Sequence, residues 1–238
     1  MLALVVMVAL APVLIEPLFN TYKPVPEGEI KTQVLKMARA NGVPVDNVFY
    51  FDASRQTTRV SANVSGLFGT AAVRLNDNLL QRASLPEIRA VMAHEIGHYS
   101  MNHVTQRLLW LGGVVALGFV FAQWAMQHLL ARFGARWRLQ GVADVASFPL
   151  LAAVFSTFLL LATPLINSIT RVQETEADLF GLNLAREPHG MAEVLLKLAE
   201  YRKPDPGALE EVIFFTHPSA RNRIYHAMRW REQMLQAP

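Results

Sequence analysis

The sequence predicts a mainly α-helical protein with a small β-sheet, whose water-soluble part is interrupted by a hairpin of two membrane-spanning helices. Three observations predict this class. Hydrophobic residues make up 52% of the 238 residues and charged residues 17%, whereas soluble domains carry about 25% charged residues. The apolar surplus is concentrated in uncharged runs, and the polar stretches between them mostly have helical spacing. Such a composition excludes intrinsic disorder, which requires low hydrophobicity and high charge.

The uncharged apolar runs predict where the chain meets a membrane. They extend from Met1 to Ile15, from Leu108 to Leu130 and from Val145 to Ile169. A helix needs about 20 apolar residues to cross a bilayer. The second and third runs reach that length, and buried helices of a soluble fold are the alternative. We interpret the first run as a span or signal-anchor; a signal peptide is the alternative, although no positive region precedes the run.

The polar stretches before the second run show both helical and strand patterns. Apolar residues follow helical spacing in one segment, and short alternating or apolar segments predict strands. Gly66 to Gly69 separates the last two strands, which predicts a hairpin. The expected elements are a helix at Glu29 to Ala40 and strands at Val48 to Phe51, Arg59 to Ser65 and Ala71 to Leu75.

A long helix is expected to lead into the second apolar run. Ser84 and Glu87 have capping-box spacing, which marks a helix start. We expect this helix to continue to about Arg107 and directly into the apolar run. Residues 170–238 are expected to be helical. The chain then divides into an anchor at 1–19, a first catalytic half at 20–107, a transmembrane hairpin at 108–169 and a second catalytic half at 170–238.

The composition also limits the chemistry. The chain has no cysteine, so a Cys-based zinc site and a thiol nucleophile are excluded. Any metal must be held by histidine and carboxylate. The net charge is +3, but Lys and Arg are scattered and no basic run interleaves with aromatics. Nucleic-acid binding is therefore not predicted, and weak attraction to anionic lipid headgroups is the simpler interpretation.

The chemical signal lies in His94-Glu95-Ile96-Gly97-His98, on the long helix. Residues four apart lie on one helix face, so His94 and His98 can aim ring nitrogens at one metal ion. Glu95 lies beside them and can handle a water molecule. This is the H-E-x-x-H pattern of zinc proteases. Two surface histidines on an amphipathic helix are the alternative, but the apolar neighbours indicate a buried stretch, where unpaired histidines are costly.

A third metal ligand is expected after the third apolar run. Catalytic zinc commonly has three protein ligands and one water. Glu174 and Asp178 share a helix face, so Glu174 could ligate zinc while Asp178 accepts the free N–H of a ligand histidine. Ala177 and Gly181 would let this helix approach the His94 helix closely. Glu176 competes with Glu174 but does not share a face with Asp178, and a solvated acidic helix start is the alternative for both.

Taken together, the residues resemble the membrane zinc metallopeptidases of the CAAX prenyl protease type, the a-factor-converting enzymes, to which the HtpX quality-control proteases are related. The prenyl protease type has several more spans before its catalytic part; a fragment, a truncated start and a short bacterial-type member all stay open. The matching segments, in order, are Asn20 to Glu29, Ser61 to Gly69, Ala93 to His98, Asn102-His103, Glu174 to Asp178 and His217 to Arg223.

The resemblance implies a zincin (gluzincin) fold and a set of site residues. Zn²⁺ would be held by His94, His98 and Glu174, with Glu95 as general base and Asp178 supporting a ligand. His217 and Arg223, which are weak signals by themselves, would lie near the active site. His217, or His103 in second place, would stabilise the oxyanion. Substrate would pair with the strand that carries Ala62, Asn63 and Val64.

The implied function is a membrane-embedded zinc endopeptidase acting on a peptide or protein substrate that is lipidated or membrane-inserted. It would lie in a bacterial-type inner membrane with its catalytic domain in the cytoplasm, although Arg132, Arg136 and Arg138 favour a cytoplasmic hairpin loop instead. One alternative is an HtpX-like quality-control protease of membrane proteins. Another is a non-catalytic zinc-binding membrane protein, against which Glu95 argues because a closed structural site needs no base.

Overall fold

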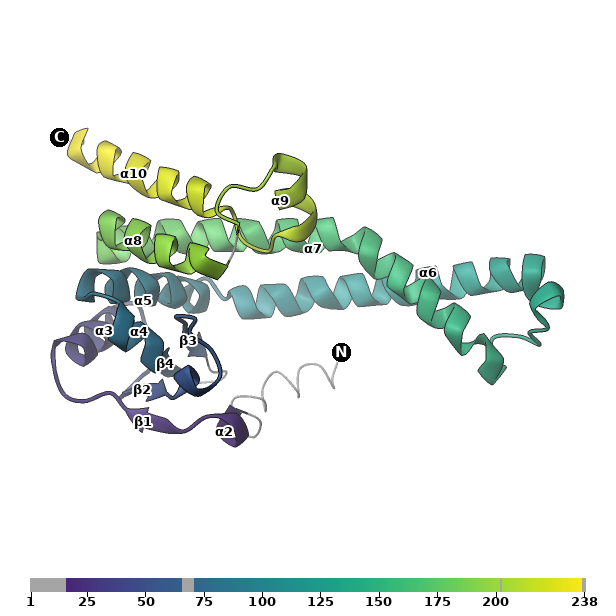
Figure 1. Cartoon of the computed structure of the whole chain (residues 1–238), viewed down its shortest axis with the longest axis horizontal. Helices are drawn as coiled ribbons and strands as arrows, with labels where there is room; N and C mark the ends of the chain where they lie inside the picture. Colours follow the sequence, from purple (N-terminus) through teal and green to yellow (C-terminus); the bar gives the residue numbers. More distant parts are fainter. Residues whose placement is uncertain (1–15, 66–70, 202, 237–238) are drawn as a thin grey trace.

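The chain forms a helical body with a small sheet on one side, and a long helical hairpin projects from that body (Figure 1). The computed structural model describes residues 16–65, 71–201 and 203–236. The expected first span, Met1 to Ile15, and the glycine turn at 66–69 lie outside the described residues. The α-helices are α2 Glu16–Phe19, α3 Glu29–Ala40, α4 Asp77–Arg82, α5 Leu85–Ser100, α6 His103–Trp137, α7 Phe148–Ala185, α8 Pro188–Leu198, α9 Ala208–Phe214 and α10 Ala220–Gln236.

The sheet has four strands in the order β1-β2-β4-β3. Strand β4 is parallel to β2, and the two outer pairs are antiparallel. The predicted pairing across the glycine turn is confirmed, with Asn63 opposite Arg74. The last strand in this order, β3, is therefore an edge strand. The strands are β1 Tyr22–Pro24, β2 Val48–Phe51, β3 Ala62–Ser65 and β4 Ala72–Asn76, and short 3-10 turns lie at Ala53–Arg55, Val145–Ser147 and Ala199–Tyr201.

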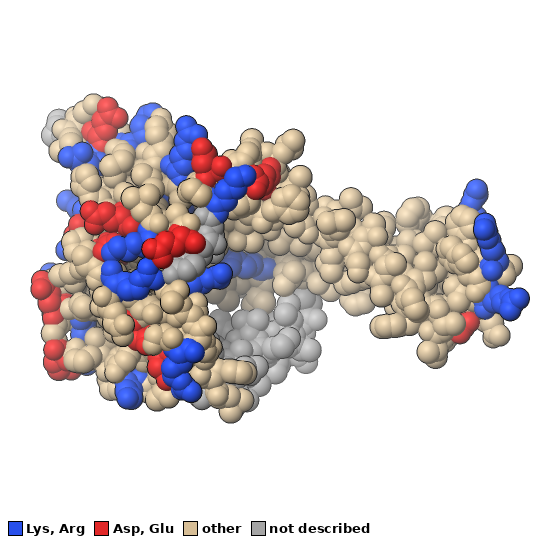
Figure 2. Space-filling model, in the orientation of Figure 1, with Lys and Arg blue, Asp and Glu red and all other residues tan. Residues whose placement is uncertain are grey.

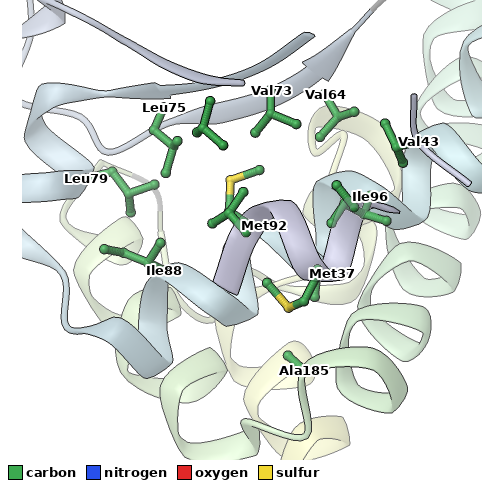
Figure 3. Packing of buried hydrophobic residues seen from close by; sticks show 14 of the residues in the cluster. Met37, Val43, Val64, Val73, Leu75, Leu79, Ile88, Met92, Ile96 and Ala185 are labelled. Atoms are coloured by element: carbon green, nitrogen blue, oxygen red, sulfur yellow. The ribbon is translucent and has the colours of Figure 1, made fainter. Parts of the chain in front are cut away.

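Helix α5 lies between the sheet and the rest of the body. Ile88, Met92 and Ile96, spaced four residues apart, are at most 1% exposed. Figure 3 shows them facing Val73 and Leu75 of the sheet. His94 lies about 200° round the helix from Met92. The burial of the apolar stripe against the sheet therefore turns the histidine face toward the opposite side, where α7 lies.

Helices α5 and α7 approach closely because small residues lie between them. A Cβ atom on Gly181 would lie 3.0 Å from the backbone nitrogen of His94. Ala177, one turn earlier on α7, is fully buried, and a Cβ on Gly97 would lie 3.3 Å from its Cα atom. The close approach expected from Ala177 and Gly181 is thus present in the structure.

The projecting hairpin consists of α6 and the first part of α7. Both helices are long and apolar enough to cross a membrane, and only 22% and 11% of their most apolar windows are buried. They are therefore not core helices of a soluble body. Figure 2 shows a projection with almost no charge along its length and basic side chains at its tip. The expected division of the chain into four parts stays a prediction.

The structure corrects one expectation about these helices. The His94 helix does not continue into the apolar run, because α5 ends at Ser100 and α6 starts at His103. Asn102, between them, has left-handed backbone geometry with φ 58°. Helix α7, in contrast, continues without interruption from the third apolar run through Glu174 to Ala185. One helix, which contains Pro164, thus includes both the second arm of the hairpin and the acidic segment.

Candidate active site

His94, His98 and Glu174 converge on one point. The Nε2 atoms of the two histidines are 3.1 Å apart. The carboxylate of Glu174 reaches them from α7, with Oε2 3.3 Å from His94 Nε2 and Oε1 3.5 Å from His98 Nε2. One ligand atom from each residue can be chosen so that all three lie within 4.8 Å of one another. The H-E-x-x-H spacing provides one side of this cluster, and the packing of α5 on α7 provides the other.

The cluster is chemically suited to zinc. Two imidazole nitrogens and one carboxylate are a common protein ligand set for catalytic zinc. Glu174 is 4% exposed, and its buried Oε2 atom has no hydrogen-bond partner. A buried carboxylate oxygen without a partner is costly unless a cation or donor meets it. Glu176, the competing carboxylate, has a half-exposed side chain directed to His103 instead.

Asp178 orients His94 from behind. Its Oδ1 atom lies 2.8 Å from His94 Nδ1. Arg223 of α10 donates to the same carboxylate through Nε at 2.7 Å and Nη2 at 2.6 Å. Burial lowers the pKa of His94, but hydrogen bonds with Asp178 and Glu174 outweigh it and raise the pKa to about 10. A metal at His94 Nε2 must therefore displace a proton.

Glu95 lines a cavity of about 310 Å³ next to the histidines. Burial raises the pKa of the Glu95 carboxyl, and the neighbouring His94 and His98 lower it in part. His217 and Arg223 line the same cavity. The cavity wall also includes apolar residues, several of them from α8: Val60, Leu79, Met191, Val194, Leu195, Leu198 and Phe215.

The loop after α9 brings His217 to the cluster. Its Nε2 atom lies 3.3 Å from Glu174 Oε2. Sequence reasoning missed the residue that holds this loop, which is Arg171. From α7, Arg171 Nη1 donates to the backbone oxygens of Phe215 at 2.6 Å and Glu211 at 2.8 Å. The sequence feature that could have indicated this role is the position of Arg171, which lies three residues before Glu174 and thus about one turn away on the same helix.

His103 does not have the expected contact with substrate. The residue is 1% exposed and is absent from the described residues that line the Glu95 cavity. Its ring lies behind His98, with the two Nδ1 atoms 2.8 Å apart. A side chain buried on the far side of a ligand histidine cannot reach a scissile carbonyl, so the substrate-binding role expected for His103 is corrected.

The edge strand β3 lies beside the cavity, which Ala62 lines together with residues 59–61. The backbone oxygen of Ser61 accepts from the Asn76 N–H of β4 at 2.9 Å. Because backbone groups alternate in direction along a strand, those of Ala62 and Val64 face away from β4. The Val64 side chain is 7% exposed in the core. Asn63 Oδ1 is buried without a hydrogen-bond partner.

A helix that carries two histidines and an intervening glutamate, completed by a carboxylate from a second helix, defines the metallopeptidase class. Comparison with known proteins agrees: the chain belongs to Peptidase family M48, whose sequence model matches residues 24–231. The resemblance to the CAAX prenyl protease and HtpX relatives is confirmed.

Individual relatives cover most of this chain. The uncharacterized metalloprotease YhfN of Bacillus subtilis (strain 168) is 31% identical over 218 residues, which are 91% of this chain and 51% of that protein. CAAX prenyl protease 1 of Saccharomyces cerevisiae is 27% identical over 231 residues, 90% of this chain and 50% of that protein. A protease HtpX homolog of Thermoanaerobacter pseudethanolicus is 27% identical over 208 residues, 80% of this chain and 68% of that protein.

The fold is also found in a solved structure. The crystal structure of S. mikatae Ste24p matches with a TM-score of 0.82 at 23% sequence identity, covering 95% of this chain and 56% of that one. The expected fold class, mainly helical with a small sheet, is therefore confirmed. The chain spans about half the length of YhfN, the yeast protease and Ste24p.

Proposed function

We propose that this chain carries the active site of a membrane-embedded, zinc-dependent endopeptidase. The observation that supports the proposal best is the convergence of His94, His98 and Glu174 beside the cavity that Glu95 lines. A purely structural zinc site is closed by protein ligands. Here an acid with a raised pKa borders an open cavity next to the ligand cluster, which favours catalysis over a non-catalytic metal site.

Peptide hydrolysis at this site assigns a role to each side chain. Zinc, when bound, supplies a Lewis acid that polarises a carbonyl and lowers the pKa of water. Glu95 accepts the proton of the attacking water and returns it to the leaving amine. Asp178 holds His94 in the tautomer that leaves Nε2 free as a ligand. Arg223 neutralises the buried Asp178 carboxylate.

We assign the stabilisation of the oxyanion to His217. Its ring borders the cavity, and Nε2 is directed to the ligand cluster, 3.3 Å from Glu174 Oε2. A hydrogen-bond donor placed where negative charge develops stabilises the transition state more than the ground state, which lowers the activation barrier. Arg171 contributes indirectly because it holds the loop that carries His217.

The substrate is a peptide or protein segment that adds to the β3 edge. The backbone groups of Ala62 and Val64 would pair with it, which makes binding independent of most side chains. The apolar cavity beside Glu95 would accept one large hydrophobic side chain. The position of the hairpin in a bilayer favours substrates that are lipidated or inserted in the membrane, as for the CAAX prenyl proteases among the relatives. Processing of misfolded membrane proteins, as for HtpX, is the second candidate.

The decisive experiment is Glu95→Gln in the full chain, purified in detergent. We expect unchanged zinc content and a fall in the peptide cleavage rate of about 10²- to 10⁴-fold, because only the general base is removed. The exposed Glu193→Gln serves as the matched control and should leave both quantities unchanged. Cleavage that survives in Glu95→Gln, or in the presence of a chelator, would contradict the proposal.

A comparison of substrates separates the two candidate functions. The wild-type chain is given an unmodified casein-type peptide, a peptide with a prenylated C-terminal cysteine, and a destabilised membrane protein. A preference in kcat/KM for the prenylated peptide over the same peptide without its lipid supports processing of the CAAX type. Equal rates for these two peptides, with cleavage of the destabilised membrane protein, support the quality-control function.

A further inference from the structure

The two candidate zinc ligands of α5 have different partners. His94 has a carboxylate behind it, namely Asp178. His98 has a second histidine, since its Nδ1 atom lies 2.8 Å from Nδ1 of His103. The two rings are nearly perpendicular, with centroids 5.0 Å apart and planes at 70°. The described part of the site therefore contains a buried imidazole to which neither the metal cluster nor the substrate cavity gives a role.

The break between α5 and α6 is what brings this ring to His98. In an uninterrupted helix a residue five positions on would lie about 140° round from His98. Instead, Asn102 adopts left-handed geometry with φ 58°. Its N–H donates to the backbone oxygen of Tyr99 at 3.0 Å, and its side chain accepts from Thr105 Oγ1 at 2.7 Å. The new helix therefore starts with His103 directed back at the metal cluster.

The hydrogen positions follow from the heavy atoms. His98 faces the cluster with Nε2, which is 3.1 Å from His94 Nε2, so a neutral His98 ligand carries its hydrogen on Nδ1. Two nitrogens at 2.8 Å need one hydrogen between them. His98 must then donate, and His103 must accept through an unprotonated Nδ1. A neutral His103 carries its own hydrogen on Nε2.

Glu176 matches this tautomer of His103. The Nε2 atom of His103 is buried, and its nearest acceptor is Glu176 Oε2 at 3.2 Å. That contact is not a hydrogen bond in the structure, but the side chain of Glu176 is 51% exposed and can rotate. The order of donors and acceptors thus runs from His98 through His103 to Glu176 without conflict.

We propose that His103 is a positioning residue for the zinc ligand His98, and that Glu176 fixes the tautomer in which His103 can accept. The inference rests on the proposed zinc site. Outer partners of this kind hold ligand rings in orientation and raise their basicity. His103 touches neither metal nor substrate. Without it, His98 Nδ1–H would be left buried and unpaired, and the ring would be free to turn away from the cluster.

The test is zinc affinity, measured by chelator competition on the full chain in detergent. We expect His103→Leu, which removes the acceptor and keeps the apolar volume, to weaken zinc binding by about 10- to 100-fold. His103→Asn places an amide oxygen near the former Nδ1 position and should restore most of the affinity. His226→Leu, on the exposed face of α10, is the matched control. The visible spectrum of the Co²⁺-loaded chain should shift in His103→Leu and not in His226→Leu.

Each outcome bears on the inference. A folded His103→Leu with zinc affinity within about twofold of wild type overturns it, given the size of the expected loss. Where His103→Leu does not fold, the exposed Glu176→Ala decides: a loss of affinity several-fold larger than in Glu193→Ala supports the inference, and equal affinities overturn it. A wild-type chain that binds no zinc contradicts the proposed function instead, so the two failures are distinguishable.

Discussion

The candidate ligands differ in how firmly the surrounding residues hold them. Glu174 lies on helix α7 and is 4% exposed. Asp178, one turn further along α7, orients His94 and is itself held by two hydrogen bonds from Arg223. The Nδ1 atom of His98 lies 2.8 Å from Nδ1 of His103. At the residue scale, both candidate histidine ligands therefore contact a side chain from another helix, which makes the site sensitive to packing as well as to its ligands.

Removal of the third ligand tests the choice between the two glutamates. We expect Glu174→Ala to lose bound zinc almost completely, because a site with two histidines alone leaves two positions to water. Glu176→Ala should keep one zinc per chain at saturating metal, since Glu176 is directed to His103 and is not part of the cluster of His94, His98 and Glu174. Zinc content is measured by elemental analysis after gel filtration. The reverse result, zinc retained in Glu174→Ala and lost in Glu176→Ala, would assign Glu176 as the ligand.

At the element scale, the site depends on the distance between α5 and α7. The distance is small because Gly181 has no side chain where α7 crosses His94. Helix α5 cannot move away from α7, since Ile88, Met92 and Ile96 are buried against the sheet on its other side (Figure 3). An added methyl group at Gly181 would therefore be accommodated by separation of the two helices, and with it of the metal ligands.

We expect Gly181→Ala to destabilise the protein by about 1–3 kcal/mol, as for other overpacked cores, and to weaken zinc binding. The matched control is Gly113→Ala on α6, where a Cβ atom would meet nothing within 4 Å. That variant should be neutral or slightly stabilising, because alanine favours helix more than glycine does. Thermal unfolding in detergent, with and without chelator, measures both effects. Equal stability of the two variants would show that α5 and α7 are not in tight contact.

The start of α5 is held by a buried ion pair that predicts a pH dependence. Glu87 is 1% exposed, accepts from the Ser84 N–H at 2.6 Å and lies 2.8 Å from Lys197 Nζ on α8. Burial raises the pKa of Glu87, but the hydrogen bonds from Lys197 and Ser84 outweigh it, so the pKa lies below the ordinary value of 4.5. The pair therefore stabilises the folded state above about pH 4.5 and loses this effect as the pH falls through the lowered pKa.

Glu87→Gln should consequently cost about 1–2 kcal/mol at pH 7 and less at about pH 3.5, because the stabilisation by the ionised carboxyl shrinks once the pH falls below the ordinary pKa of 4.5. Unfolding midpoints at the two pH values provide the measurement. Lys197→Met should show the same convergence toward wild type in acid. A destabilisation by Glu87→Gln that does not change with pH would mean that packing, and not the ion pair, stabilises this helix start.

At the scale of the whole molecule, one continuous helix connects the projection to the body that carries the candidate site. Helix α7 contains both the third apolar run and Glu174, so a helix and not a loop joins the hairpin to the site. Figure 2 shows basic side chains at the tip of the projection. Arg132 and Arg136 lie near the end of α6, and Arg138 directly follows it. We infer that the tip and the catalytic body lie on opposite sides of the membrane.

Site-directed labelling tests this arrangement, and the absence of native cysteine leaves no background. We expect Arg136→Cys to react with an impermeant maleimide in intact cells, and Lys36→Cys on α3 to react only after permeabilisation, which places catalysis in the cytoplasm. Both positions are exposed. The opposite pattern would place catalysis outside, as the arginines at the tip favour by the positive-inside rule. Labelling of both positions from one side would show that the hairpin does not cross the bilayer.

The elements of this protein could largely be predicted from its sequence, because they depend on local periodicity. The spacing of His94 and His98 on one helix face, the pairing of β3 with β4 and the two long apolar helices all follow from patterns within a few residues. The likeness of the motif order to a metallopeptidase family was sufficient to predict the family, which the match over residues 24–231 confirms.

The roles of side chains that meet through space depended on the tertiary structure. Glu174 was already favoured over Glu176 from the sequence, but only the packing of α7 on α5 brings its carboxylate to His94 and His98. The contribution of Arg171 follows from its hydrogen bonds to the loop after α9. His103 was expected to face substrate, and the left-handed turn at Asn102 places it behind His98 instead. Local spacing in the sequence determines which residues lie on the same face of a helix. The distance between atoms of different elements depends instead on how the elements pack, and α5 and α7 pack closely because small residues such as Gly181 lie between them.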